Sequence, residues 1–178
     1  MVAPPASGTR AMEDREAPLP SLYLETTIVS YATARPSNDP LIREHQRLTR
    51  GWWAEKRRNY RVFASQAVVE EAEGGDASAA EERLRLLAEV TLLPPDPRIE
   101  PVASMVRLAL RIPEKAVSDA LHLAFAVHYR LDYLLTWNCA HLANAQSLRR
   151  LADFCRAEGL WLPIICTPEE MTEWEGEV

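Results

Sequence analysis

Long hydrophobic runs and cysteines are scarce in this 178-residue chain, and each scarcity excludes a class of protein. No uninterrupted apolar stretch approaches the roughly 18 residues that a membrane-spanning helix needs. Cys139, Cys155 and Cys166 show no CxxC spacing, and three cysteines cannot all pair with one another. A structural zinc site and a disulfide scaffold are therefore poor interpretations, and the reducing cytoplasm is the expected location.

Glycine motifs and an excess of positive charge are missing as well. The sequence contains no GxSxG, no P-loop and no GxGxxG, which argues against a small α/β hydrolase and against a phosphotransfer domain. The net charge is −6. This charge argues against binding of nucleic acid through bulk positive charge, but it leaves room for a nuclease with a local basic patch.

One such basic patch interrupts the acidic composition. Seven basic and two acidic side chains lie between Arg43 and Arg61. Trp52 and Trp53 lie within this segment, and an apolar helix face or a dimer seam explains the pair better than base stacking does. The residues expected to contact RNA or a partner protein are Arg43, Arg47, Lys56, Arg57 and Arg58.

The beginning of the chain differs from the rest. Residues 1–20 hold four prolines and almost no large apolar side chains, and they lack the apolar run of a secretory signal. We expect them to form a disordered leader, or to precede the true start of the protein. Residues 21–178 are expected to form one domain, because a chain of this length supports one core more readily than two.

Beyond residue 20, short apolar segments alternate with helical patterns. Strands are expected over residues 22–24, 60–64, 90–93, 132–136 and 162–166. A helix is expected after the first strand, with Thr26 or Thr27 as its cap. Further helices are expected over residues 40–59, 65–73, 76–88, 113–129, 141–157 and 167–170, and one in the segment before residue 111. Crossovers of this length require a parallel sheet with helices on both faces, so the predicted fold class is α/β.

Polar side chains follow two of the expected strands. Glu25 comes directly after the first strand, and Asn138 follows the fourth. Open α/β sheets place their ligand sites beyond the carboxyl ends of the strands, and Glu71 and Asp119 lie on helices that can converge there. Three carboxylates and an amide form a hard-oxygen site suited to Mg²⁺ or Mn²⁺, which in turn supports hydrolysis of phosphodiesters.

Each of these residues also has a simpler explanation. Glu25 can be a solvated turn residue, and Glu71 can belong to the solvated face of an acidic helix. Asp119 is more informative, because it lies at the edge of an apolar stripe where an unpaired carboxylate is costly. A structural hydrogen bond to a neighbouring helix is the alternative for Asp119. His122, one turn further on, is a group supporting the site, a general base or a hydrogen-bonded core histidine.

Cys139 and His141 form a CxH pair that fits no common zinc pattern. We interpret this spacing as incidental.

Four segments of the chain together resemble the PIN-domain family. They are LYLETTIVSY (22–31), ASQAVVEEAEGGD (64–76), KAVSDALHLAFAV (115–127) and DYLLTWNCAHLANA (132–145). The resemblance extends over about residues 22–168, and DALHLA and LLTWNCAHLAN are its most specific parts. Within the family, the sequence is most similar to the VapC-like toxins of bacterial type II toxin–antitoxin systems.

This resemblance implies a three-layer α/β/α sandwich around a central parallel sheet of about five strands. It implies a Mg²⁺- or Mn²⁺-dependent endoribonuclease that cuts single-stranded RNA and leaves 5′-phosphate and 3′-hydroxyl ends. It also implies a homodimer that a cognate antitoxin protein inhibits by inserting a segment into the active site. The alternative is a PIN fold that has lost its catalytic activity and binds RNA or protein without cutting.

The resemblance also assigns metal-binding and catalytic roles to individual residues. It places the family's first acid at Glu25, the second at Glu71 with Glu70 as the less favoured registration, and the third at Asp119. The fourth position, an aspartate in many members, falls on Asn138. The hydroxyl residue that commonly follows the first acid falls on Thr26 or Thr27. Apart from the resemblance, Thr26, Thr27, Thr136 and His122 are expected to support the site: Thr26 and Thr27 can bond the backbone or metal-bound water, and Thr136 can hold metal-bound water.

Two of these positions depart from the family pattern. Glu25 is one methylene longer than aspartate, so the metal must lie further out or the end of the strand must retract. Asn138 keeps an oxygen ligand but removes a charge, which weakens the expected metal affinity.

Overall fold

Five parallel strands form a single sheet in the computed structural model, which describes residues 18–172. Most of the expected leader therefore lies outside the described residues. The strands are β1 (Ser21–Leu24), β2 (Arg61–Ala64), β3 (Thr91–Leu92), β4 (Tyr133–Leu135) and β5 (Ile164–Cys166). All five strands expected from the sequence are present. β1 is one residue longer than predicted, because it begins at Ser21, and the other four strands are shorter than predicted.

The order of the strands is β3-β2-β1-β4-β5, so β1 lies at the centre of the sheet. Leu22 pairs with Val62 of β2 on one side, and Tyr23 pairs with Leu134 of β4 on the other. All four residues of β1 are buried, as expected for a central strand covered on both faces. The chain first builds the sheet outward from β1 to β3 and then returns to the opposite edge of β1. This reversal places a topological switch point at the carboxyl ends of β1 and β4.

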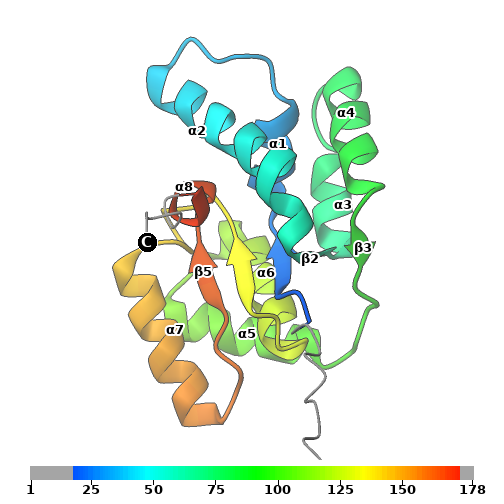
Figure 1. Cartoon of the computed structure of the whole chain (residues 1–178). Coiled ribbons are helices and arrows are strands. Elements are labelled where there is room, and N and C mark those ends of the chain that lie inside the picture. The colour runs from blue at the N-terminus through cyan, green and yellow to red at the C-terminus, as the bar shows by residue number, and fades with distance from the viewer. Residues whose placement is uncertain (1–17, 173–178) are drawn as a thin grey trace, which may run out of the picture.

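Helices cover both faces of the sheet (Figure 1). Contacts join α1 to α2, α3 and α4 in one layer, and α5 to α6 and α7 in the other. This is the α/β/α sandwich that the resemblance implied. The helical segments are α1 (Thr26–Thr33), α2 (Pro40–Gly51), a π-helical turn (Trp52–Lys56), a 3₁₀ turn (Arg57–Asn59), α3 (Gln66–Ala72), α4 (Ala77–Leu87), α5 (Ile99–Leu110), a 3₁₀ turn (Glu114–Ala116), α6 (Val117–His128), α7 (Ala145–Glu158) and α8 (Pro168–Thr172).

The first helix is capped by a residue other than the one expected. Glu25, not Thr26 or Thr27, is the N-cap of α1, and its carboxylate accepts a hydrogen bond from the backbone N–H of Thr27. The extended backbone at Glu25 allows its side chain to reach that N–H, as a capping residue must. The expected cap of α4 is confirmed, because the carboxylate of Asp76 accepts from the backbone N–H of Ala79.

Two of the long expected helices are interrupted or shortened. The helix that begins at Pro40 ends at Gly51, and the wider π-helical turn that follows buries Trp52 completely. Trp52 is therefore part of the core and is not available for a surface seam. The helix expected from His141 begins instead at Ala145, because the side chain of Asn144 caps it by accepting from the N–H of Ser147.

The helices of the described residues are also too short or too polar to cross a bilayer. This finding agrees with the distribution of apolar residues in the sequence.

Candidate metal centre

The carboxyl ends of β1 and β4 are tied together where the candidate residues begin. The backbone N–H of Glu25 donates to the carbonyl oxygen of Leu135, the last residue of β4, at 3.1 Å. Glu25 therefore lies next to Thr136, which continues the chain beyond β4. Because the switch point of the sheet opens here, side chains from helices of both layers can reach the same place.

The carboxylate of Glu25 is held by threonines. Only 4% of the residue is exposed, and its Oε2 atom accepts from Oγ1 of Thr27 at 2.5 Å and from Oγ1 of Thr136 at 2.7 Å. The backbone N–H of Thr27 donates to the same oxygen at 3.2 Å. None of these three bonds involves the other carboxylate oxygen, Oε1. Neutral donors thus fix the orientation of a buried carboxylate and leave one of its oxygens for another ligand.

Glu71 on α3 faces Glu25 from the opposite side. Its Oε2 atom accepts from the hydroxyl of Thr26 and lies 3.1 Å from Nε2 of His122. Burial alone would raise the pKa of Glu71, but hydrogen bonds and the charge of His122, with further hydrogen bonds from Thr26 and Ser118, outweigh it and lower the pKa to about 2. The carboxylate is therefore ionised at neutral pH and available to a cation.

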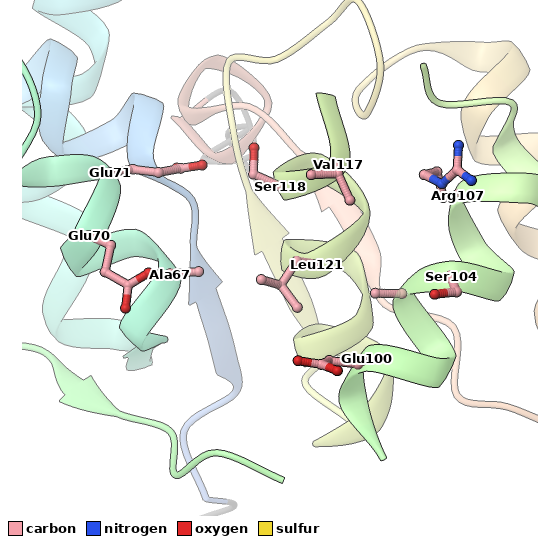
Figure 2. A pocket seen from close by; sticks show the side chains of 10 residues that line it. Ala67, Glu70, Glu71, Glu100, Ser104, Arg107, Val117, Ser118 and Leu121 are labelled. Carbon is pink, nitrogen blue, oxygen red and sulfur yellow. The ribbon is translucent and has the colours of Figure 1, made fainter. Parts of the chain in front are cut away.

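Figure 2 distinguishes Glu71 from its neighbour Glu70. The side chain of Glu71 points across toward Ser118 on α6, whereas the side chain of Glu70 turns away from it. This arrangement favours the registration at Glu71 over the alternative at Glu70.

His122 on α6 is completely buried and is oriented by a second hydrogen bond. Its Nδ1 atom lies 2.9 Å from the hydroxyl of Tyr23, which in turn lies 2.7 Å from the hydroxyl of Ser65. Burial is the largest cause that raises the pKa of Tyr23 above its ordinary value, so this hydroxyl stays protonated. The pair of bonds fixes the imidazole ring with Nε2 directed at Glu71.

One ligand atom each from Glu25, Glu71 and His122 lies within 4.8 Å of the other two. We call these three residues the candidate centre. Among residues 18–172, no ion pair links either glutamate to a lysine or an arginine. Within these residues the basic partner of Glu71 is His122, and Glu25 has none. Two carboxylates at such close range suit a cation that balances their charge, and their oxygens are ligands that divalent ions accept.

Asp119 and Asn138 lie beside each other around His141. Oδ2 of Asp119 is 2.7 Å from Nδ1 of His141, and Oδ1 of Asn138 accepts from the backbone N–H of His141 at 3.1 Å. Asp119 also follows Ser118, whose side chain contributes to the low pKa of Glu71. His141, a residue that the sequence did not place at the site, is therefore the hydrogen-bonding partner of a predicted metal ligand.

Thr136 connects the two groups of residues. Its hydroxyl donates to Glu25 and accepts from the backbone N–H of Asn138 at 2.8 Å. Thr27 makes a similar connection, because its hydroxyl accepts from the backbone N–H of Trp137 at 2.9 Å. Two of the three threonines that were predicted to support the site, Thr27 and Thr136, thus bind both its backbone and the carboxylate of Glu25.

The arginine-rich segment, residues 43–61, has a different character. Arg43 donates to the carbonyl oxygen of Ser37, and Arg47 forms an exposed ion pair with Glu44 at 2.6 Å. Arg57 donates to the carbonyl oxygen of Glu89, and its guanidinium lies over the ring of Trp53. Lys56 lies in the π-helical turn, and Arg58 is exposed in the 3₁₀ turn after it.

A groove of about 580 Å³ opens beside Glu71. Residues of α3, α5 and α6 line it, and Figure 2 shows the side chain of Leu121 between the two glutamates of α3 and Glu100 of α5. The groove combines apolar side chains with hydroxyls and charged groups at its rim. The lining residues are Ala67, Glu70, Glu71, Glu100, Ala103, Ser104, Arg107, Val117, Ser118 and Leu121.

Sequence reasoning missed two residues of this region, Tyr23 and His141. His141 follows β4 within the same turn as Asn138, so the rule that places ligands beyond strand ends was a signal for it. Tyr23 carried no comparable signal, because a tyrosine between two leucines of a strand is explained by packing alone.

A comparison with protein families places this arrangement among known proteins. The family model described as "PIN domain" matches residues 22–138, which include every residue of the candidate centre as well as Asp119 and Asn138. No curated protein matches the sequence.

Proposed function

Because the chain belongs to the PIN-domain family, whose members are generally nucleases, we propose that it is a metal-dependent endoribonuclease that hydrolyses phosphodiester bonds in single-stranded RNA. One observation carries the proposal: Glu25, Glu71 and His122 converge within 4.8 Å of one another at the switch point of the sheet. Two carboxylates at this place suit a divalent cation, and the cofactor we propose is Mg²⁺ or Mn²⁺.

The residues that would hold the ion are Glu25 and Glu71, with Asp119 and Asn138 on the adjoining side of the site. The donor set fits a divalent ion, since three of these four side chains are carboxylates and Oε1 of Glu25 is not used by the threonines. When bound, the ion would neutralise phosphate charge and lower the pKa of a water molecule.

The chain's own residues prepare the site for this chemistry. Thr27 and Thr136 fix the carboxylate of Glu25, while Thr26 and His122 fix that of Glu71. His141 fixes the carboxylate of Asp119. Such support holds oxygens in position before the substrate arrives, so that little reorganisation is needed during the reaction.

The groove beside Glu71 supports a strand of nucleic acid as the substrate. Its volume lies within the range of pockets that take small organic ligands, and a nucleotide falls into that range. Arg107 lies at the rim and offers a positive charge to a phosphate. We propose that three exposed arginines of the segment, Arg43, Arg47 and Arg58, and the half-buried Lys56 and Arg57 contact RNA or the partner protein.

We further propose that the protein acts in the cytoplasm as the toxin of a type II toxin–antitoxin pair. The resemblance to VapC-like toxins supports this role, and with it a cognate antitoxin and a homodimer. Trp161 and Leu108, which are 42% and 70% exposed, provide apolar surface for such contacts. Purification from the native host tests the role directly. Recovery with a small companion protein supports it, whereas a lone monomer contradicts it.

A second candidate function rests on Asn138. This position lacks the acid of many family members, and its Oδ1 atom already accepts from the backbone of His141. A centre weakened in this way suits a PIN fold that binds RNA or protein without cutting. Titration of the protein with Mn²⁺ distinguishes the two candidates, because saturable binding favours the enzyme.

The direct test is cleavage of single-stranded RNA in Mg²⁺ or Mn²⁺. We expect the wild type to cut, chelator to abolish cutting, and Asp119→Asn to reduce the rate by about 10- to 100-fold or more, as loss of a group in a metal site does. Asp153→Asn is the matched control, since this aspartate is exposed on α7 and pairs with Arg156. Equal rates for wild type and Asp119→Asn, or cutting in chelator, would disprove the mechanism.

A further inference from the structure

His122 supplies a nitrogen atom to a site that the sequence predicted to consist of oxygens. We propose that Nε2 of His122 binds the divalent cation directly, together with Glu25 and Glu71, and that the centre therefore prefers Mn²⁺ to Mg²⁺. The inference rests on the proposed function in one respect, namely that the candidate centre holds a divalent cation.

The spacing of the atoms fits direct binding. Nε2 of His122 lies 3.1 Å from Oε2 of Glu71, and the ligand atom of Glu25 lies within 4.8 Å of both. In an octahedral site with metal–ligand distances of about 2.1 Å, neighbouring ligand atoms lie about 3 Å apart. The two side chains thus already have the separation of adjacent ligands, and a cation can replace the contact between them without a large movement of either.

The second nitrogen of the ring is bound in the way that metal-ligating histidines require. Nδ1 contacts the hydroxyl of Tyr23, and that hydroxyl contacts Ser65. If Nδ1–H donates to Tyr23, and Tyr23 donates to Ser65, then a cation can take the place of the Nε2 proton that bridges His122 and Glu71, and this proton is released to solvent. Histidine ligands almost always donate their other N–H to such a partner, which fixes the tautomer and the ring.

One oxygen from each of the other two proposed ligands contacts His141. Oδ1 of Asn138 accepts from the backbone of His141, and Oδ2 of Asp119 contacts the His141 ring. Both contacts direct these side chains toward His141. The atoms that converge on one point are instead the two glutamate oxygens and the nitrogen of His122.

A nitrogen ligand changes which ion the centre prefers. Mg²⁺ binds oxygen ligands and loses its water reluctantly, whereas imidazole suits first-row transition ions, and Mn²⁺ accepts both carboxylate and imidazole. A centre of two glutamates and one histidine is therefore expected to bind Mn²⁺ at least about tenfold more tightly than Mg²⁺. Four oxygens alone would give a smaller difference.

Calorimetric titration of the full chain with MnCl₂ and with MgCl₂ measures this preference. We expect His122→Gln, which offers an amide oxygen in place of Nε2, to lower the preference for Mn²⁺ to about threefold or less. His128→Gln is the matched control, because it removes the other histidine of α6, which pairs with Asp96 and not with the centre, and it is expected to keep the preference. An unchanged preference in His122→Gln, or its loss in His128→Gln, would overturn the inference.

A spectroscopic measurement on the wild type avoids any dependence on the folding of His122→Gln. Electron spin echo modulation of the Mn²⁺-loaded protein is expected to show coupling to an imidazole ¹⁴N nucleus, and His128→Gln is expected to retain it. Saturable Mn²⁺ binding without ¹⁴N coupling overturns the role of His122 but leaves the proposed nuclease intact. Failure to bind either Mn²⁺ or Mg²⁺ overturns both.

Discussion

The candidate centre and the arginine-rich segment are both rich in charge, but they use it in opposite ways. In the centre, neutral threonines hold Glu25, and its carboxylate has no basic partner among the described residues. In the segment, arginines donate to carbonyl oxygens of the same domain: Arg50 to Ala32 and Ala34, and Arg57 to Glu89. A buried carboxylate that neutral donors orient, and that lacks a basic partner, indicates a ligand site. Arginines whose N–H groups donate to carbonyl oxygens of the same domain indicate a structural role.

This difference separates a site from a patch that is merely charged. The high proportion of arginines in the sequence of the segment predicts contact with RNA or a partner protein, but it does not show which of these arginines the fold uses. The structure divides the members into those that hold the backbone of the domain and those, such as Arg58, that are exposed. The following variants test the comparison between the candidate centre and the arginine-rich segment, beginning with the largest expected effect.

Glu71→Gln is expected to have the largest effect, at the centre. Removal of one charged oxygen ligand should weaken Mn²⁺ binding, measured by calorimetry, by at least about 100-fold, since even supporting residues of metal sites cost 10- to 100-fold. Glu70→Gln is the matched control on the same helix and should bind Mn²⁺ like the wild type. Equal loss in both variants would contradict the distinction between Glu71 and Glu70.

Arg50→Gln is expected to affect stability and not the centre. Its guanidinium donates to two backbone carbonyl oxygens at the C-terminal end of α1, and loss of such charged hydrogen bonds should lower the free energy of unfolding by about 2 kcal/mol. Urea denaturation measures this change. Arg47→Gln should lower the free energy of unfolding less than Arg50→Gln does, because its ion pair with Glu44 is exposed. A larger loss in Arg47→Gln than in Arg50→Gln would reverse the comparison.

Arg58→Gln is expected to have the smallest effect and to change binding alone. Because the side chain is exposed, stability should stay within about 0.5 kcal/mol of the wild type. If Arg58 contacts a phosphate, the slope of log affinity for single-stranded RNA against log salt should fall by about 0.7. Arg156→Gln on α7 is the control, and an identical slope in all three proteins would remove Arg58 from the RNA contacts.

The sequence predicted the parallel sheet and the acids near its carboxyl edge because both depend on local pattern. Short apolar segments between helices specify the strands, and the switch-point rule then directs attention to Glu25 and Asn138. The sequence did not predict the hydrogen bond between Asp119 and His141, since a hydrogen bond between a helix and a distant turn leaves no periodic signal.

The same limit applies to Tyr23 and to the end of α2. The partners of Tyr23, Ser65 and His122, lie 42 and 99 residues away along the chain, so only the folded sheet brings them together. The helical pattern from Pro40 to Asn59 gave no sign of the π-helical turn that buries Trp52. Local propensity describes elements well, but it does not describe how one element adapts to the core beside it.

The central place of β1 has a consequence for how the protein is made. A chain emerging from the ribosome can pair β1 with β2 early, but the other edge of β1 stays open until β4 has been synthesised. Thr136, which orients the carboxylate of Glu25, arrives with β4. For most of its synthesis, the nascent chain therefore has an unpaired edge of β1 and a centre that lacks Thr136. Docking of β4 against β1 ends both conditions.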